Sequence, residues 1–273
     1  MQNAYIAGTI VALGAGVMGY FMVLRGQSFA GHSLANVGFA GATGAVYVGM
    51  PPIVGMFIAG AIAAFGMHVL GLGVRHTHRS DIAIGAVLTA SLAVGFLFVS
   101  LAAKQYAVNI YSVLFGNVLG ISDSDVLTMG VTVAVLLTIA ILSARPLLFA
   151  SIDPDVAAAR GVPVRWLGLG FLLLLAMVVA VAVQIVGVLL IFSLLVTPAA
   201  TARRLSPRPA RAIVISVALA LAFTWLGLTV GYYTDYPDSF YITTFAFGTY
   251  LAVRGGEGLA LQFRRYAKAK VTQ

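Results

Sequence analysis

Cysteine is absent from this 273-residue sequence, and charged residues make up only 9% of it. Without cysteine the chain has neither a disulfide framework nor a thiolate metal site. With so little charge and 61% hydrophobic residues, it is too apolar to be a soluble domain of this length. Apolar runs of about twenty residues recur along the chain, which is typical of a helical membrane protein.

Motifs of several energy-coupling and hydrolytic proteins are also missing. All three lysines follow alanine, whereas a nucleotide-binding loop needs Gly-Lys-Ser/Thr, and no His-Glu pair exists for an H-E-x-x-H metalloprotease motif. The eight carboxylates lie in expected loops or at helix ends, whereas an ion-coupled carrier usually holds an ionisable group deep in the bilayer. The chain is therefore not expected to hydrolyse ATP, and uphill transport would take its energy from a partner.

The hydropathy pattern predicts an all-α integral membrane protein in which residues 1–273 form a single domain. About nine membrane spans are expected, at 4–24, 29–49, 52–73, 81–103, 125–143, 166–184, 186–202, 211–231 and 239–253. The apolar but interrupted stretch at 106–122 predicts a short re-entrant or surface helix.

The charge distribution predicts how these spans are oriented. Alternating them from an outside N-terminus puts fifteen of the sixteen basic residues inside, with Lys104 alone outside. The C-terminus is then cytoplasmic, and the aromatic-rich loop at 232–241 faces outward. We therefore interpret the net charge of +8 as a topology signal in a lipid bilayer and not as a nucleic-acid-binding surface.

Two polar residues interrupt the second apolar run. The stretch LRGQSFAGHSLANVGFAG, residues 24–41, puts His32 and Asn36 four residues apart and therefore on one helix face. Its small residues let other helices approach closely. Asn36 would lie roughly 16 Å beyond Arg25, about half the hydrocarbon thickness. This His32–Asn36 pair is predicted to line a substrate path; the alternative is that both side chains hydrogen-bond neighbouring helices.

Three further polar residues are candidates for the same path. Pro198 is expected to kink the seventh span or interrupt its hydrogen bonding, which would free backbone groups beside Thr197 and Thr201 to line a cavity. Local hydrogen-bond repair is the alternative for these threonines. His68, near the end of the third span, is either a pathway residue or a packing histidine.

Two acidic residues lie in the expected outer loop before the last span. Asp235 and Asp238 would draw cations to an outer mouth. Aspartates that form a turn beside Pro237 are an equally good account.

The most polar segment on the expected cytoplasmic side is residues 144–167. Its stretch 155–160 favours a short helix, with an acidic start and a basic end that suit the helix dipole. Gly161 would end this helix, and Pro163 would prevent its continuation. Such a helix can seat in a groove of a cytoplasmic protein, although an ordinary loop with one helical turn fits the pattern as well.

Four segments together resemble the zinc/manganese/iron permease family of ABC importers. They are the cytoplasmic segment, whose Asp-rich start leads into Ala-x-x-x-Gly, the 24–41 stretch, IYSVLFGNVLGISDSDV at 110–126 and VGVLLIFSLLVTPAATARRLS at 186–206. They follow the family's order and spacing and cover most of residues 24–206. The resemblance implies the fold of type II ABC importers, with no catalytic residue and no permanently bound cofactor in this chain.

The resemblance also implies partners. Members of that family form homodimers, associate with two cytoplasmic ATPase subunits and receive metal from an extracytoplasmic metal-binding protein. Coupling to the ATPase would then fall to the cytoplasmic segment, at Asp153, Asp155, Ala157, Arg160 and Gly161.

One departure from the family pattern concerns the cargo. The family has Gly-Asp-x-x-x-His in the second helix, whereas the matching positions here are Gly31-His32 and Asn36. Imidazole suits zinc and other late first-row metals, while an asparagine carbonyl is a weak, neutral ligand. His32 and Asn36 are therefore the expected metal ligands, with paired copies adding ligands in a dimer. Zinc is favoured over manganese or iron as the transported divalent metal.

We therefore expect a multi-pass permease subunit, in the inner or plasma membrane, of an ATP-driven importer of a divalent transition metal. Three alternatives stay open. The chain would otherwise be a gradient-driven secondary metal carrier, a permease for a metal chelate, or a membrane scaffold without any path.

Overall fold

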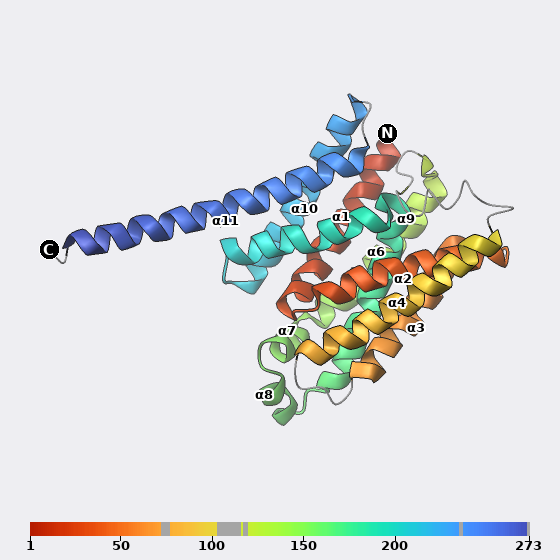
Figure 1. The fold of residues 1–273 in the computed structure, drawn as a ribbon, viewed down its shortest axis with the longest axis horizontal. Coiled ribbons are helices and arrows are strands. Elements are labelled where there is room, and N and C mark those ends of the chain that lie inside the picture. Colours follow the sequence, from red (N-terminus) through yellow and green to blue (C-terminus); the bar gives the residue numbers. More distant parts are fainter. Residues whose placement is uncertain (72–76, 103–115, 117–119, 235–236, 272–273) are drawn as a thin grey trace.

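The structure is a computed structural model that describes residues 1–71, 77–102, 116, 120–234 and 237–271. Its long elements are all α-helices (Figure 1), which confirms the all-α prediction for this part of the chain. In chain order they are α1 (Gln2–Leu24), α2 (Ser28–Tyr47), α3 (Pro52–Gly71), α4 (Thr77–Ala102), α6 (Asp123–Leu142), α7 (Ala144–Ile152), α8 (Pro154–Ala159), α9 (Val164–Leu205), α10 (Pro209–Tyr232) and α11 (Asp238–Val271).

The helix α9 lies at the centre of the bundle. It packs against α1, α2, α3, α10 and α11, and 78% of the most apolar stretch within Val164–Val188 is buried. The helices α4 and α6 bury only 17% of their most apolar stretches. Each of them has large exposed apolar side chains. Such apolar outer faces are what helices in contact with hydrocarbon require.

Two arms that meet at Gly187 make up α9, and they point in different directions (Figure 1). Gly187 has φ 78° and ψ 164°, a backbone conformation essentially restricted to glycine. Gly116, itself at φ 80°, lies against this break, because a Cβ on it would overlap the carbonyl of Ile185. The helix continues through Pro198, so the break lies at the glycine and not at the proline.

Six described helices are long and apolar enough to cross a membrane, so the predicted count of nine spans is not matched. They are α1, α3, α4 from Asp81, α6, the first arm of α9, and α10. In α2 and in α11, polar or charged side chains interrupt the apolar runs. His32 and Asn36 do so in α2. The helix that carries this predicted pair is therefore one of the less apolar ones.

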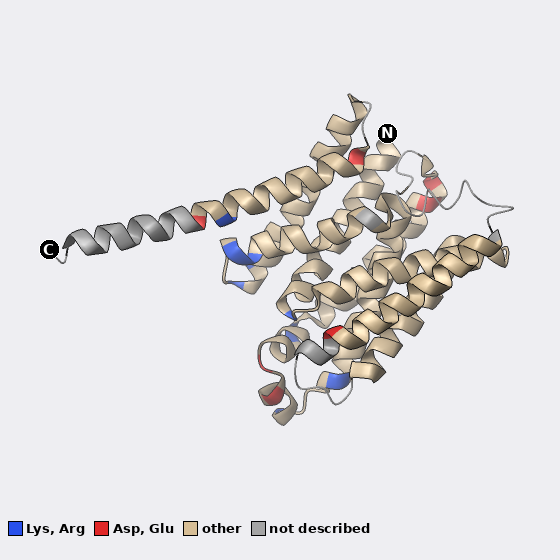
Figure 2. Cartoon of the chain, in the orientation of Figure 1, with Lys and Arg blue, Asp and Glu red and all other residues tan. Residues whose placement is uncertain are grey.

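Basic residues gather toward one end of the bundle, whereas acidic residues lie at both ends (Figure 2). Basic residues lie near α7 and α8 and at the turn between α9 and α10, whereas the acidic first turns of α6 and α11 lie at the opposite end. Such a clustering of basic residues is what the predicted orientation requires. The orientation itself stays a prediction.

The contact between α2 and α3 depends on two glycines that leave no room for a side chain. A Cβ on Gly41 would overlap the carbonyl of Gly55, and a Cβ on Gly55 would overlap that of Gly41. The two backbones therefore approach closely, as small residues allow in membranes. Gly38, about one turn earlier in α2, has nothing within 4 Å of its Cβ position.

The substitution Gly41→Ala is expected to destabilise the protein by about 2 kcal/mol, because the added Cβ forces α2 and α3 apart. Gly38→Ala is the matched control in the same helix. It is expected to be neutral or stabilising, because alanine favours a helix over glycine by about 1 kcal/mol. Thermal unfolding midpoints of the two purified variants, measured in one detergent, check this difference. Equal midpoints would contradict the close approach of α2 and α3.

Candidate functional site

The structure places His32 and Asn36 side by side on α2. The amide nitrogen of Asn36 lies 3.4 Å from Nε2 of His32 and donates to the His32 carbonyl oxygen at 2.9 Å. Within the described residues, Oδ1 of Asn36 makes no hydrogen bond. Both side chains are half-buried. The asparagine carbonyl oxygen is therefore available to a ligand.

Two aromatic rings hold the His32 imidazole. Phe29 of α2 stacks on it with ring centroids 6.4 Å apart, and Phe192 of the second α9 arm meets it edge-on at 5.1 Å. Nδ1 of His32 is buried and has no hydrogen-bond partner in the described part of the chain. An unpartnered buried polar atom costs about 1–3 kcal/mol of folding free energy. A ligand that binds Nδ1 would recover part of that free energy.

The His32–Asn36 pair is not a complete metal centre by itself. Across residues 1–71, 77–102, 116, 120–234 and 237–271, no group of three or more His, Asp or Glu side chains is placed to hold a metal ion. Two neutral donors fall short of the four ligands that zinc usually takes. Further ligands would have to come from water or a second subunit. Such weak coordination suits a path, because a conducted ion must also leave.

The other predicted path residues are Thr197, Thr201 and His68. Thr201 is fully buried, and its hydroxyl donates to the carbonyl oxygen of Thr197 at 2.8 Å, the ordinary bond of a helical threonine to the residue four before it. His68 is half-buried in the last turn of α3. No hydrogen bond or ring contact of the described residues joins these three to His32 or Asn36.

Of the two predicted outer-mouth residues, Asp235 lies outside the described residues. Asp238 is the first residue of α11 and packs against Gly231 of α10. A Cβ on Gly231 would overlap the Asp238 carboxylate. Burial raises the pKa of the Asp238 carboxyl, because desolvation disfavours the charged form. This packing favours a role at the start of α11 over cation attraction.

The predicted coupling segment contains a short capped helix, α8. At its start the Asp153 carboxylate accepts from the backbone N–H of Val156 at 3.0 Å. Beyond its end Gly161 adopts φ 82°, and the N–H of Val162 donates to the carbonyl of Ala157 at 3.0 Å, a common glycine-dependent helix end. The predicted short helix and its glycine stop are confirmed.

One side of α8 is open to a partner. Asp155, Val156 and Arg160 are exposed, whereas Ala157 is fully buried. The helix α7, which the sequence did not predict, lies between α6 and α8 and packs against α8. The exposed side of α8 therefore offers an apolar side chain between an acidic and a basic one.

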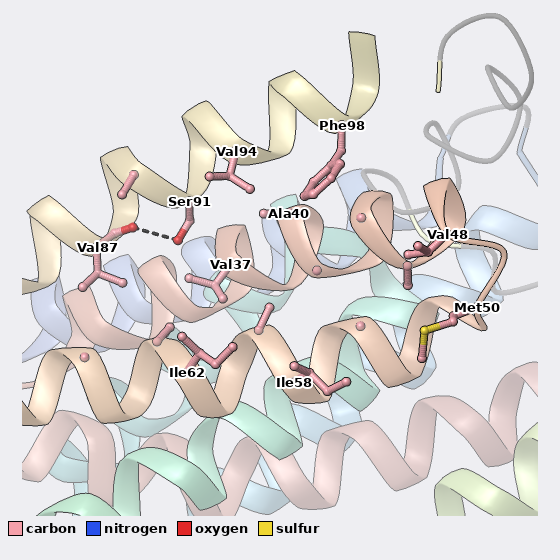
Figure 3. Close-up of a pocket in the computed structure, with 18 residues that line it drawn as sticks. Val37, Ala40, Val48, Met50, Ile58, Ile62, Val87, Ser91, Val94 and Phe98 are labelled. Atoms are coloured by element: carbon pink, nitrogen blue, oxygen red, sulfur yellow. Dashed lines mark hydrogen bonds between the residues drawn. The ribbon is translucent and has the colours of Figure 1, made fainter. Parts of the chain in front are cut away.

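A groove of about 530 Å³ between α2, α3 and α4 is unsuited to an ion (Figure 3). Its wall is apolar apart from Ser91, whose hydroxyl already donates to the carbonyl of Val87 at 2.7 Å. Most of its lining on α2, such as Val37 and Gly44, lies roughly 120° around the helix from the His32–Asn36 pair, whereas Ala40 lies one turn beyond Asn36. The groove therefore faces mainly away from the pair.

Comparison with known sequences shows what this chain resembles. The sequence profile of the ABC 3 transport family matches residues 1–254. The manganese transport system membrane protein MntC of Halalkalibacterium halodurans is 34% identical over 234 residues, which cover 85% of this chain and 77% of that protein. The chelated iron transport system membrane protein YfeC of Yersinia pestis is 35% identical over 238 residues, which cover 86% and 79%.

The fold is similar to a solved structure as well. PsaBC from Streptococcus pneumoniae in complex with Fab gives a TM-score of 0.82 over 92% of this chain and 90% of its own, with 29% sequence identity. The family resemblance drawn from four sequence segments is confirmed over most of the chain. The chain belongs to the ABC 3 transport family.

Proposed function

We propose that this chain is the permease subunit of an ATP-driven importer that carries a divalent transition metal. A chain of this family is a membrane subunit of a transport system and not an enzyme. The observation that carries the proposal is the half-buried His32–Asn36 pair, whose Nδ1 has no partner among the described residues. Polar groups inside a membrane are costly and mark substrate paths by default.

The cargo class follows from two sources. The relatives are named for manganese and for chelated iron, whereas the imidazole of His32 favours later first-row metals such as zinc. We propose a divalent first-row metal, with zinc preferred by this donor set. Chelated iron is a second candidate, because YfeC is among the relatives.

A homodimer would complete the path. His32 and Asn36 are half-buried in one chain, and their remaining surface would meet hydrocarbon if the chain acted alone. A second copy that covers this side of α2 would bury both side chains and add two more donors. The path would then lie between the two copies.

The energy would come from a separate cytoplasmic ATPase that docks on the exposed side of α8. A metal-binding protein would deliver the ion at the opposite end, where the N-terminus faces outward from the plasma membrane. ATP binding and hydrolysis would move residues 153–165 and rock the helices, which would open the path alternately to the two sides.

Metal uptake by proteoliposomes tests this proposal. The vesicles contain the permease assembled with its ATPase and binding protein, and manganese, ferrous iron and zinc are supplied in competition, with and without ATP. A parallel set receives a ferric chelate. We expect ATP-dependent accumulation of one metal. Equal accumulation without the ATPase would support a gradient-driven carrier, and no ATP-dependent accumulation by an assembled complex would refute the proposal.

A further inference from the structure

Arg25 lies in the turn between α1 and α2 and is half-buried against the bundle. Its guanidinium lies over the Phe171 ring of α9, 5.2 Å from the ring centroid, and close to Gly168 of the same helix. Burial lowers the pKa of Arg25. In the part of the chain that the structure describes, no carboxylate lies within ion-pair distance of it. A cation that is partly removed from water without a counter-ion is costly, and the contacts of this guanidinium offset part of that cost.

The same guanidinium contacts the coupling segment. Its Nη1 donates to Oγ of Ser151 at 3.3 Å, and its Nε donates to Oε1 of Gln27 at 3.3 Å. Ser151 belongs to α7 and lies two residues before Asp153, which caps α8. The Ser151 hydroxyl in turn donates to the carbonyl of Leu147, which fixes its lone pairs for the arginine.

Few other contacts hold the α7–α8 segment to the bundle. For the residues that the structure describes, the Arg25–Ser151 bond is the sole side-chain hydrogen bond between α7 or α8 and the rest of the chain. The remaining attachment is packing of α7 against α6, α9 and α1, and of α8 against α9. Beside this packing and the backbone that leads from α8 into α9, the Arg25–Ser151 bond is therefore a defined polar link from the α7–α8 segment to the turn before α2.

The geometry points to Arg25 as a positioning residue that transmits movement of α8 to α2, and so to the His32–Asn36 pair. His32 lies seven residues beyond Arg25, in the first two turns of α2, which begins at Ser28. Arginine suits this task because its planar fork reaches two acceptors while its face stacks on an aromatic ring, whereas lysine offers a compact point charge. The inference rests on the proposed function, because it concerns coupling between ATP hydrolysis and transport.

The ratio of metal accumulated to ATP hydrolysed, measured in the proteoliposomes described above, tests this role. We expect Arg25→Gln and Ser151→Ala each to lower the ratio about fivefold, because coupling is lost while the ATPase still turns over. Arg25→Lys should also lower it, because a lysine cannot reproduce the fork. A merely structural defect reduces the number of active complexes, which lowers both rates together and leaves the ratio unchanged.

Arg203 provides a matched control. It donates to the carbonyl of Val23 at 2.8 Å, close to Arg25 in the chain fold, yet it makes no hydrogen bond to the described residues of α7. Arg203→Gln is expected to keep the wild-type ratio. In the double variant of Arg25→Gln with Ser151→Ala, the ratio should fall no further than in either single variant, because both changes remove the same link.

Three results would overturn the inference while wild-type complexes still import metal with ATP. They are an unchanged ratio in Arg25→Gln, an equal fall in Arg203→Gln, or additive effects in the double variant. Wild-type complexes that fail to accumulate metal with ATP would instead refute the proposed function, and the inference with it. The two failures are therefore distinguishable.

Discussion

The His32→Ala variant is expected to import metal at least about tenfold more slowly than the wild type at saturating ATP. Alanine removes the imidazole that faces Phe192 and carries the unpartnered Nδ1. Because the side-chain hydrogen bond of His32 to the described residues is a long one, 3.4 Å from Nε2 to the Asn36 amide nitrogen, the variant should still fold and assemble with its partners. Initial uptake rates, normalised to the amount of assembled complex, measure the effect.

Ser33→Ala is the matched control for His32→Ala. Ser33 is the next residue of α2, and its buried hydroxyl donates to the carbonyl of Ile84 in α4 at 3.3 Å. Its loss removes a polar contact from the same helix without touching the His32–Asn36 pair, so uptake should stay within about twofold of wild type. If His32→Ala kept both the wild-type rate and the wild-type order of metals, the pair would not belong to the path.

The Gly187→Ala variant is expected to lose about 2 kcal/mol of stability, because φ 78° and ψ 164° belong to a region that alanine does not adopt without strain. For a chain of this size the thermal midpoint should fall by roughly 4–8 °C. Uptake should fall as well, because the second α9 arm carries Phe192, which contacts His32. Midpoint and uptake are measured on the same preparation.

The Gly170→Ala variant is the control for Gly187→Ala. It tests whether the loss of stability comes from the unusual backbone at residue 187 or from replacing any glycine of α9. Gly170 lies in the regular first arm of α9 and has nothing within 4 Å of its Cβ position. The variant should match or slightly exceed the wild-type midpoint, because alanine favours a helix. A Gly187→Ala protein as stable as Gly170→Ala would show that α9 can run straight through residue 187.

Features that depend on neighbours in sequence were predictable. The α8 helix could be predicted because Asp153 and Gly161 act within a few residues of the helix they bound. The proximity of His32 and Asn36 follows from helical spacing alone. The family could be predicted because four short segments occur in a fixed order.

Features that depend on tertiary contacts were not predictable. The bond between Arg25 and Ser151 joins residues 126 positions apart, and neither residue stands out in the sequence. The contact between His32 and Phe192 requires the bend in α9, and Gly187 lies in an apolar run that carries no other turn signal. The predicted count of nine spans is not matched by the six described helices that are long and apolar enough to cross a membrane.

The bend in α9 also has a mechanical meaning. Four residues separate the end of α8 from the first arm, and the second arm carries Phe192 beside His32. One continuous backbone thus connects the end of α8 with the ring that contacts His32, and it bends where Gly116 lies against Gly187. If α8 moves with an ATPase as proposed, the rigidity of the backbone at this bend would determine how much of that movement reaches Phe192.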